Sequence, residues 1–399
     1  MKTRLIYLQS GFWNKVREDS SVEGQRTLLE LYDIFSESDI CSDMNIEEWK
    51  NDELLMFILK KYVSGGNIEL EFDSKDKIEN VLNSTEENIE ELSAVYMLNE
   101  SKMKCDGYGI QKGILAITPD NLPRRKDLFK GQSFSVDKGV NYERTYLSFR
   151  DKLKHFCNSM IIIDPYILSK PKLLQENLIP LLKSILPENL KIPFHLSIFS
   201  KIADNKPIDE MYSQIEEELK KIRQNLDIEL SIHKIIGTDN EFHSRHIITN
   251  NALIDSEDGF NLFNYIKEST KNATITKVYP RFLGDDRGDM SKYLKWISIA
   301  KKRALSKKEI IGGAKWGDGN NRLFDMIEDT NNNSSNKPTE IKKSSVQHQE
   351  TTKPCSNNIA SNSKTKDSKT EYIYLKNIGR KISGNRTKTI KFRTRTRRK

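Results

Sequence analysis

The sequence predicts an α/β protein with two folded domains and a disordered, basic C-terminal tail. Short apolar runs alternate with amphipathic stretches, a polar connection rich in Pro, Gly and charge interrupts them, and low-complexity sequence follows near the C-terminus. We therefore expect an N-terminal α/β domain over 1–120, a connector over 121–141, a second α/β domain over 142–325, and a linker and tail over 326–399.

Charge is distributed unevenly along the chain, which has 399 residues and a net charge of +8. Residues 331–399 hold 18 Lys and Arg against 4 Asp and Glu, a net charge of +14. Residues 1–330 hold 47 against 53, a net charge of −6. A mildly acidic folded part with a basic arm is typical of a protein tethered to nucleic acid or to an anionic surface.

The tail ends in ten Lys and Arg with no acid between Gly379 and Lys399. Cations that neutralise phosphates release counterions, so such a run favours nucleic acid. An anionic membrane or a merely solvated charge run are the alternatives. The residues expected to contact nucleic acid are Arg380, Lys381, Arg386, Lys388, Lys391, Arg393, Arg395, Arg397, Arg398 and Lys399.

The cysteines are scattered and form no C-x-x-C pair, which excludes a zinc knuckle and gives no disulfide framework. No run approaches 18 apolar residues, and the N-terminus lacks the features of a cleaved signal peptide. We expect a cytoplasmic protein with no transmembrane segment, no metal and no cofactor.

In the first domain, apolar strands and amphipathic helices alternate. A turn is expected at Gly11. Strands are predicted over 3–9, 68–72, 94–98 and 113–118, and helices over 28–35 and 54–59.

Scattered acids in this domain could be gathered into a magnesium-dependent nuclease site of the PIN type: Asp33, Glu47, Glu48, Asp52, Glu53 and Asp106. A site of that family needs an acid at the end of the first strand, where Leu8, Gln9 and Ser10 offer none. Solvated helix faces explain the acids better. The domain is therefore similar to a PIN-like unit without its first carboxylate.

The second domain has a regular order of elements. Met160–Ile163 is a continuous apolar run, as expected of a strand buried on both faces, and Asp164, Pro165 and Tyr166 follow at its carboxyl end, where open α/β sheets bind ligands. Further helices are predicted over 142–156, 172–186, 208–226 and 291–305, and strands over 194–199, 228–236 and 252–254.

His243, Arg245 and Asn250 stand at the spacing of an H-x-K-x4-D motif with Arg and Asn substituted. On a strand, side chains two residues apart share a face, so His243 and Arg245 would approach one phosphate together. The motif and the element order resemble the phospholipase D-like phosphodiesterases over about residues 145–270. The turn ending in Gly259 and Phe260 is similar to that of degenerate members, including MIT-domain proteins that bind phosphoinositides without hydrolysis.

The resemblance implies a phospholipase D-like sandwich and a phosphohistidine mechanism in which His243, Arg245 and Asn250 are the catalytic set. A second histidine comes from a second motif copy, so catalysis by this chain would need a homodimer. Phosphate would contact Arg245, Asp164, Tyr166 and Ser256. We expect a protein that binds the nucleic-acid backbone, or a weak metal-independent nuclease; the alternative is a non-catalytic interaction or membrane-tethering module.

Three other interpretations remain open at this level. His243 and His246 form H-x-x-H, which would ligate zinc on a helix but points to opposite faces of a strand. The whole stretch 241–260 could be a sheet edge with satisfied polar groups. Asp164 could be a catalytic acid, although an Asp-Pro pair at a strand end is more often a turn or cap.

Overall fold

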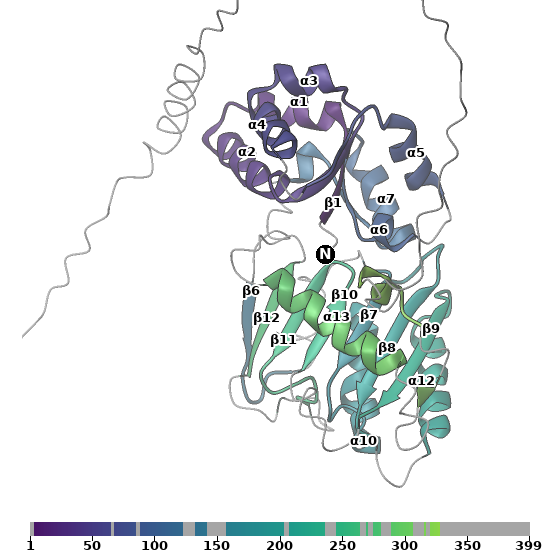
Figure 1. Ribbon diagram of the computed structural model, residues 1–399. Helices are drawn as coiled ribbons and strands as arrows, with labels where there is room; N and C mark the ends of the chain where they lie inside the picture. The colour runs from purple at the N-terminus through teal and green to yellow at the C-terminus, as the bar shows by residue number, and fades with distance from the viewer. Residues whose placement is uncertain are drawn as a thin grey trace, which may run out of the picture. The chain divides into compact units, whose positions relative to one another are not determined.

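The computed structural model is a mixed α/β protein with two sheets (Figure 1). Both sheets belong to one compact unit, Met1–Asn332. The structure describes residues 4–64, 68–84, 88–122, 132–141, 157–202, 207–235, 245–263, 269, 274–280, 289–305, 315–316 and 320–327. His243, the expected helix 142–156 and the basic tail lie outside these residues.

The first sheet is fully parallel, with the strand order β3-β2-β1-β4-β5. Strands β2 and β3 are added on one side of β1 and strands β4 and β5 on the other, which is the doubly wound arrangement. The strands are β1 (Arg4–Leu8), β2 (Ser38–Ser42), β3 (Leu70–Glu71), β4 (Val95–Met97) and β5 (Leu115–Ile117). The predicted strands are confirmed with shorter bounds, and β2, a polar SDICS segment, was not predicted.

Helices cover both faces of this sheet. They are α1 (Ser10–Glu18), α2 (Val22–Phe35), α3 (Ile46–Asn51), α4 (Glu53–Val63), α5 (Lys75–Asn83), α6 (Ile89–Leu92), α7 (Lys102–Lys112) and the 3-10 helix η1 (Pro119–Asn121). Ile6 and Leu8 of β1 enter one core and Tyr7 enters the other, as a period of two requires. Tyr7 stacks on Tyr96 of β4 with ring centroids 4.7 Å apart.

The predicted turn at Gly11 is wrong, because helix α1 begins at Ser10. Phe12, Trp13 and Val16 recur at helical spacing and are all buried. Gly11 is required for a different reason: a Cβ there would lie 2.4 Å from the amide nitrogen of Asn99. The glycine therefore allows close packing after β4 and does not break the helix.

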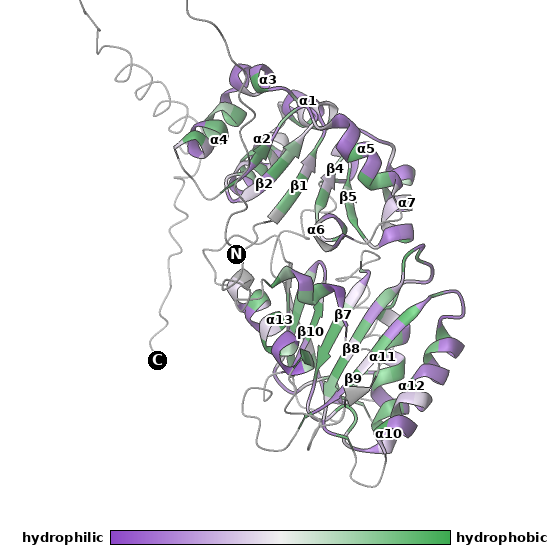
Figure 2. Cartoon of the chain, turned by 45° about the vertical axis from the view of Figure 1, so that its right-hand side comes forward, coloured by the Kyte–Doolittle hydropathy of each residue, from purple (hydrophilic) through white to green (hydrophobic). Residues whose placement is uncertain are grey.

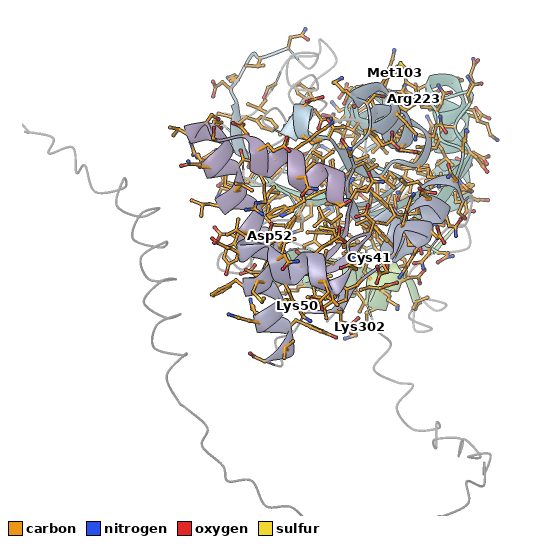
Figure 3. All side chains as sticks on the ribbon, turned by 90° about the horizontal axis from the view of Figure 1, so that it is seen from above. Cys41, Lys50, Asp52, Met103, Arg223 and Lys302 are labelled. Atoms are coloured by element: carbon orange, nitrogen blue, oxygen red, sulfur yellow. The ribbon has the colours of Figure 1, made fainter. Side chains whose placement is uncertain are left out.

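Three of the candidate acids of the first domain, Asp52, Glu48 and Asp106, have structural roles. The Asp52 carboxylate, labelled in Figure 3, accepts the Trp13 indole N–H at 2.8 Å and pairs with Arg17. It also caps α4 by accepting the N–H groups of Leu54 and Leu55. Glu48 closes a capping box on α3, and Asp106 pairs with Lys102 one turn away. Among the residues that the structure describes, no three His, Cys, Asp or Glu side chains form a group that could hold a metal ion.

The second sheet is mixed and has the order β13-β9-β8-β7-β10-β11-β12-β6. β7, β8 and β9 are parallel to one another, and the remaining neighbours pair antiparallel. The strands are β6 (Gln132–Val136), β7 (Ser159–Ile163), β8 (Phe194–Ser200), β9 (Ile228–Lys234), β10 (His246–Thr249), β11 (Ala252–Ser256), β12 (Thr274–Pro280) and β13 (Lys315–Trp316). β6 lies within the expected connector 121–141 and is an edge strand of this sheet.

Each face of the second sheet packs on its own helices. One face carries α10 (Pro171–Leu173), the π-helical turn η3 (Leu174–Leu178), α11 (Ile179–Ile185) and α12 (Ile208–Ile222). The other carries α13 (Asp289–Leu305) and the 3-10 helix η7 (Arg322–Met326). Figure 1 shows α13 lying across the sheet, and Figure 2 shows hydrophobic strands beneath helices with hydrophilic outer faces. β7 is consequently buried on both faces, as its apolar run predicted.

Among the described residues, no helix is long and apolar enough to cross a membrane. Cys41, Cys105 and Cys157 are buried, free thiols, as the scattered spacing predicted. Burial raises the pKa of the Cys157 thiol to about 12, so this thiol is unreactive.

Candidate phosphate-binding site

A row of polar residues crosses the second sheet at the carboxyl ends of its parallel strands. The row contains Ser200, Asp164, Arg245, Ser256 and Thr276. Each lies two residues from a member of the apolar core under α10–α12, namely Ile198, Ile162, Ile247, Ile254 and Val278. Because side chains alternate along a strand, the polar row continues this core face to the edge of the sheet.

Asp164 is the most buried charged residue of this row, with no exposed surface. Its two carboxylate oxygens accept the backbone N–H groups of Tyr166 at 2.8 Å and of Phe260 at 2.7 Å. Burial raises the pKa of Asp164, although the N–H groups and the nearby Arg245 guanidinium oppose that shift. These contacts make Asp164 a cap that joins the turn after β7 to the loop after β11.

Arg245 precedes β10 and lies beside Asp164. Its Nη1 donates to the carbonyl oxygen of Glu257 at 2.7 Å, and its guanidinium carbon lies 5.5 Å from the centroid of the Tyr166 ring. Arg245 Nε is buried and has no hydrogen-bond partner among the described residues. A buried donor of this kind needs an acceptor, which an anion would supply.

Lys201 brings a second cation to the same tyrosine. It follows β8 directly, its backbone N–H donates to Pro165, and its Nζ lies 5.4 Å from the Tyr166 ring centroid. Within the described part of the chain, neither Lys201 nor Arg245 forms a salt bridge. Two cations that lack a salt-bridge partner in this part of the chain therefore flank an aromatic ring that is 36% exposed.

The loop Ser256–Phe260 closes over the row. The Ser256 hydroxyl donates to the carbonyl of Gly259, and Gly259 has a left-handed backbone with φ +85°. A Cβ on Gly259 would lie 2.7 Å from both Arg245 Cδ and an Asp164 carboxylate oxygen. Only glycine fits between these two side chains, because both the space and the backbone conformation exclude a larger residue.

Asn250 is at the opposite end of β10 from Arg245, about 16 Å away at the usual rise per strand residue. It is completely buried. Its amide donates to the carbonyl oxygens of Leu92 at 3.2 Å and Gly113 at 3.0 Å, and its side-chain oxygen accepts the backbone N–H of Asn158 at 3.0 Å. Asn250 therefore joins loops of the two sheets and lies away from the polar row.

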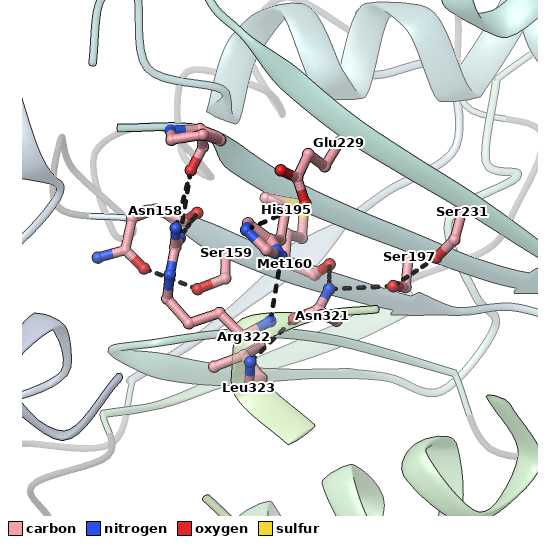
Figure 4. A network of polar contacts seen from close by, with 11 residues as sticks. Asn158, Ser159, Met160, His195, Ser197, Glu229, Ser231, Asn321, Arg322 and Leu323 are labelled. Atoms are coloured by element: carbon pink, nitrogen blue, oxygen red, sulfur yellow. Dashed lines mark hydrogen bonds and ion pairs between the residues drawn. The ribbon is translucent and has the colours of Figure 1, made fainter. Parts of the chain in front are cut away.

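A polar network continues from Asn158 along the amino ends of β7 and β8 (Figure 4). The Arg322 guanidinium donates to the carbonyl oxygens of Asn158 and Pro193, and the Arg322 backbone N–H donates to His195 Nδ1. Asn321 donates to the Met160 carbonyl and to the Ser197 hydroxyl. These bonds fasten η7 to the sheet from the end opposite to the polar row.

His246 faces the α13 side of the sheet, away from Arg245. Its ring lies 4.2 Å from the Trp296 ring, and its Nδ1 is 3.4 Å from an Asp255 carboxylate oxygen. Burial lowers the pKa of His246 to about 4, so the ring is neutral at physiological pH. These contacts give His246 a packing role.

The predicted site residues thus divide into three groups. Asp164, Tyr166, Arg245 and Ser256 come together at the carboxyl edge, whereas Asn250 lies at the other end of β10. His243 and the tail cations lie outside the described residues. Sequence reasoning did not identify Lys201, although a lysine directly after a buried parallel strand is a usable signal. Nothing in the sequence distinguishes Thr276, whose buried hydroxyl belongs to the same row.

No protein-family model matches this chain, and a comparison with curated proteins finds no significant match.

The first prediction concerns Gly259. Gly259→Ala should destabilise the fold by about 1–2 kcal/mol for the left-handed backbone and by about 1–3 kcal/mol more for the contacts with Arg245 and Asp164. Gly139→Ala is the matched control, because Gly139 has φ +80° and a Cβ added there would meet nothing within 4 Å. Urea unfolding measures both free energies. Equal losses in the two variants would contradict the packing described around Gly259.

The second prediction concerns an acid at position 250. Asn250→Asp should lower the free energy of unfolding on the order of 3–5 kcal/mol, because a buried carboxylate would face two carbonyl oxygens and donate to neither. The loss should shrink at acidic pH, where the protonated carboxyl donates again. Denaturant titration at two pH values measures it.

Asn83→Asp serves as the control for this substitution, since the Asn83 amide is exposed and bonds within its own helix. Its effect should stay within about 0.5 kcal/mol. Wild-type stability in Asn250→Asp at neutral pH would rule out the structural role assigned to the Asn250 amide.

Proposed function

We propose that this protein binds the phosphate backbone of nucleic acid at the carboxyl edge of its second sheet. Arg245 and Lys201 supply the positive charge, Tyr166 supplies the surface between them, and the basic C-terminal arm adds affinity. The observation that carries the proposal is the position of these two cations, neither in a salt bridge within the described residues, at 5.4 and 5.5 Å from the ring of one exposed tyrosine.

The chemistry of the site suits a phosphate better than it suits a carboxylate or a neutral ligand. The Arg245 guanidinium has an unoccupied Nε donor among the described contacts, and a guanidinium binds two oxygens of one phosphate in a planar fork. Lys201 adds a compact point charge from the end of β8, on the other side of β7 from Arg245. Asp164 accepts two backbone N–H groups, so both of its carboxylate oxygens have partners within the fold.

A degenerate phospholipase D-like domain is the fold family that we propose for the second sheet. Support comes from the strand-helix order, from Arg245 at the motif's cationic position, and from the placement of Arg245 at the carboxyl edge. Asn250 departs from the motif's acid, and its two carbonyl partners supply a physical reason, since they require a donor.

Binding without hydrolysis is the activity that we favour. The sequence contains one copy of the motif, and the family's phosphohistidine mechanism needs a histidine from each of two copies. A homodimer that pairs two His243 residues would restore the chemistry. A metal-independent nuclease is therefore the alternative outcome of the experiments below, and an anionic-membrane tether is the other.

The third prediction tests the two cations in the full chain. Arg245→Ala and Lys201→Ala should each weaken binding to a fluorescent single-stranded oligonucleotide by about tenfold, because a charge-assisted hydrogen bond contributes about 1.5–3 kcal/mol. Each should also reduce the magnitude of the log-log salt slope by about 0.7. Fluorescence anisotropy at several salt concentrations measures both quantities.

Arg26→Ala and Lys220→Ala are matched controls, since both side chains are exposed on helices away from the row and pair with acids on their own helix. The proposal fails if the controls weaken binding as much as the site variants do. Cleavage that survives a chelator and disappears in His243→Ala would establish the nuclease alternative. Binding to anionic vesicles with the same dependence on Arg245 would favour the membrane tether.

The fourth prediction concerns the basic arm. Residues 371–399 contain 11 Lys and Arg and one acid. If about half of these cations contact phosphate, the full chain should show a log-log salt slope on the order of −4 to −5, and deletion of 371–399 should flatten it. A truncated protein with the slope of the full chain would contradict a nucleic-acid role for the arm.

A further inference from the structure

The exposed ring of Tyr166 distinguishes this site from a site that binds only an anion. Its backbone is fixed on both sides, because its N–H donates to Asp164 and its carbonyl accepts the N–H and the hydroxyl of Ser169. The ring is 36% exposed, whereas Tyr7, Tyr96 and Tyr293 are buried in the cores. A rigid turn therefore presents one aromatic ring at the edge of the sheet.

Two cations lie close to the Tyr166 ring. Lys201 Nζ and the Arg245 guanidinium lie at nearly equal distances from the ring centroid, and they come from the strand ends on the two sides of β7. Both cations lie over the ring as cation–π contacts, and the ring is still 36% exposed. An exposed aromatic ring together with cations combines the stacking surface and the positive charge by which proteins bind a single strand, with a base on the ring and phosphates on the cations. Inorganic phosphate has no group that would use the ring.

We infer that the site takes single-stranded nucleic acid, with one base stacked on Tyr166 and the adjacent phosphates on Lys201 and Arg245. This inference rests on the proposed function and adds the strandedness of the ligand. A duplex keeps its bases stacked inside the helix, so a base reaches Tyr166 only from a single strand or a frayed end. The site therefore binds a single strand in preference to a duplex of the same sequence.

The experiment compares three ligands of matched length on the full chain: a single-stranded oligonucleotide, the same sequence as a duplex, and an abasic strand with the same phosphates. Wild type should bind the single strand about tenfold more tightly than the abasic strand, since stacking of one base on an aromatic side chain commonly accounts for a factor of this order. Tyr166→Leu should abolish that difference, and Tyr166→Phe should keep it.

Tyr62→Leu is the matched control, because Tyr62 is 38% exposed on helix α4. A 2-aminopurine base in the strand gives a second readout, since its fluorescence should be quenched by wild type and by Tyr166→Phe but not by Tyr166→Leu. Circular dichroism establishes that each variant is folded, and the Phe variant keeps the test valid if the Leu variant unfolds.

The outcomes separate the inference from the function on which it rests. Wild type could bind the ordinary single strand and the abasic strand with equal affinity, and Arg245→Ala could bind neither. That result would overturn stacking and leave backbone binding intact. Preference for the duplex would also overturn the inference. If substitutions at Arg245, Lys201 and Tyr166 leave the affinity for every strand unchanged, both the proposed function and the inference fail.

Discussion

The central strand β7 is buried on both faces, and the arrangement of the second sheet follows from that constraint. Its five residues, Ser159–Ile163, expose no side chain to solvent, so every polar group near it must be satisfied at one of its two ends. Asn158 precedes the strand and Asp164 follows it, and both are completely buried. The two ends of β7 consequently differ in their polar groups: an amide side chain lies at the amino end and a carboxylate lies at the carboxyl end.

At the amino end, buried amides satisfy backbone carbonyl oxygens. Asn158 and Asn250 both donate to Leu92, and Arg322 donates to Asn158 in turn. Neutral amides suit this position because they donate and accept without carrying a charge into a buried site. This junction explains why an asparagine stands at position 250, because the neighbouring carbonyl oxygens of Leu92 and Gly113 require a donor.

At the carboxyl end of β7, the buried polar group is a charged one, the carboxylate of Asp164. Asp164 is held by backbone N–H groups from two loops, and this fixes Tyr166 on one side and Phe260 on the other. Gly259 lets the loop approach closely enough for Arg245 to lie beside the carboxylate without a salt bridge to it. Guanidinium and ammonium groups therefore remain available for an anion at this edge of the sheet.

The sequence by itself determined the α/β class and the apolar strand Met160–Ile163, because the hydrophobic period is a local property. The contact of Arg245 with Asp164 was decided by the tertiary structure, since it joins two strands that are distant in the chain. It did not determine helix α1, since Gly11 indicates a turn until Asn99 is known to pack on it. Nor did it determine the strand β6, whose QSFSV segment becomes a strand only by pairing with β12. The roles of Lys201 and Asn250 follow from the tertiary structure alone, because the residues that they contact lie on segments distant in the chain.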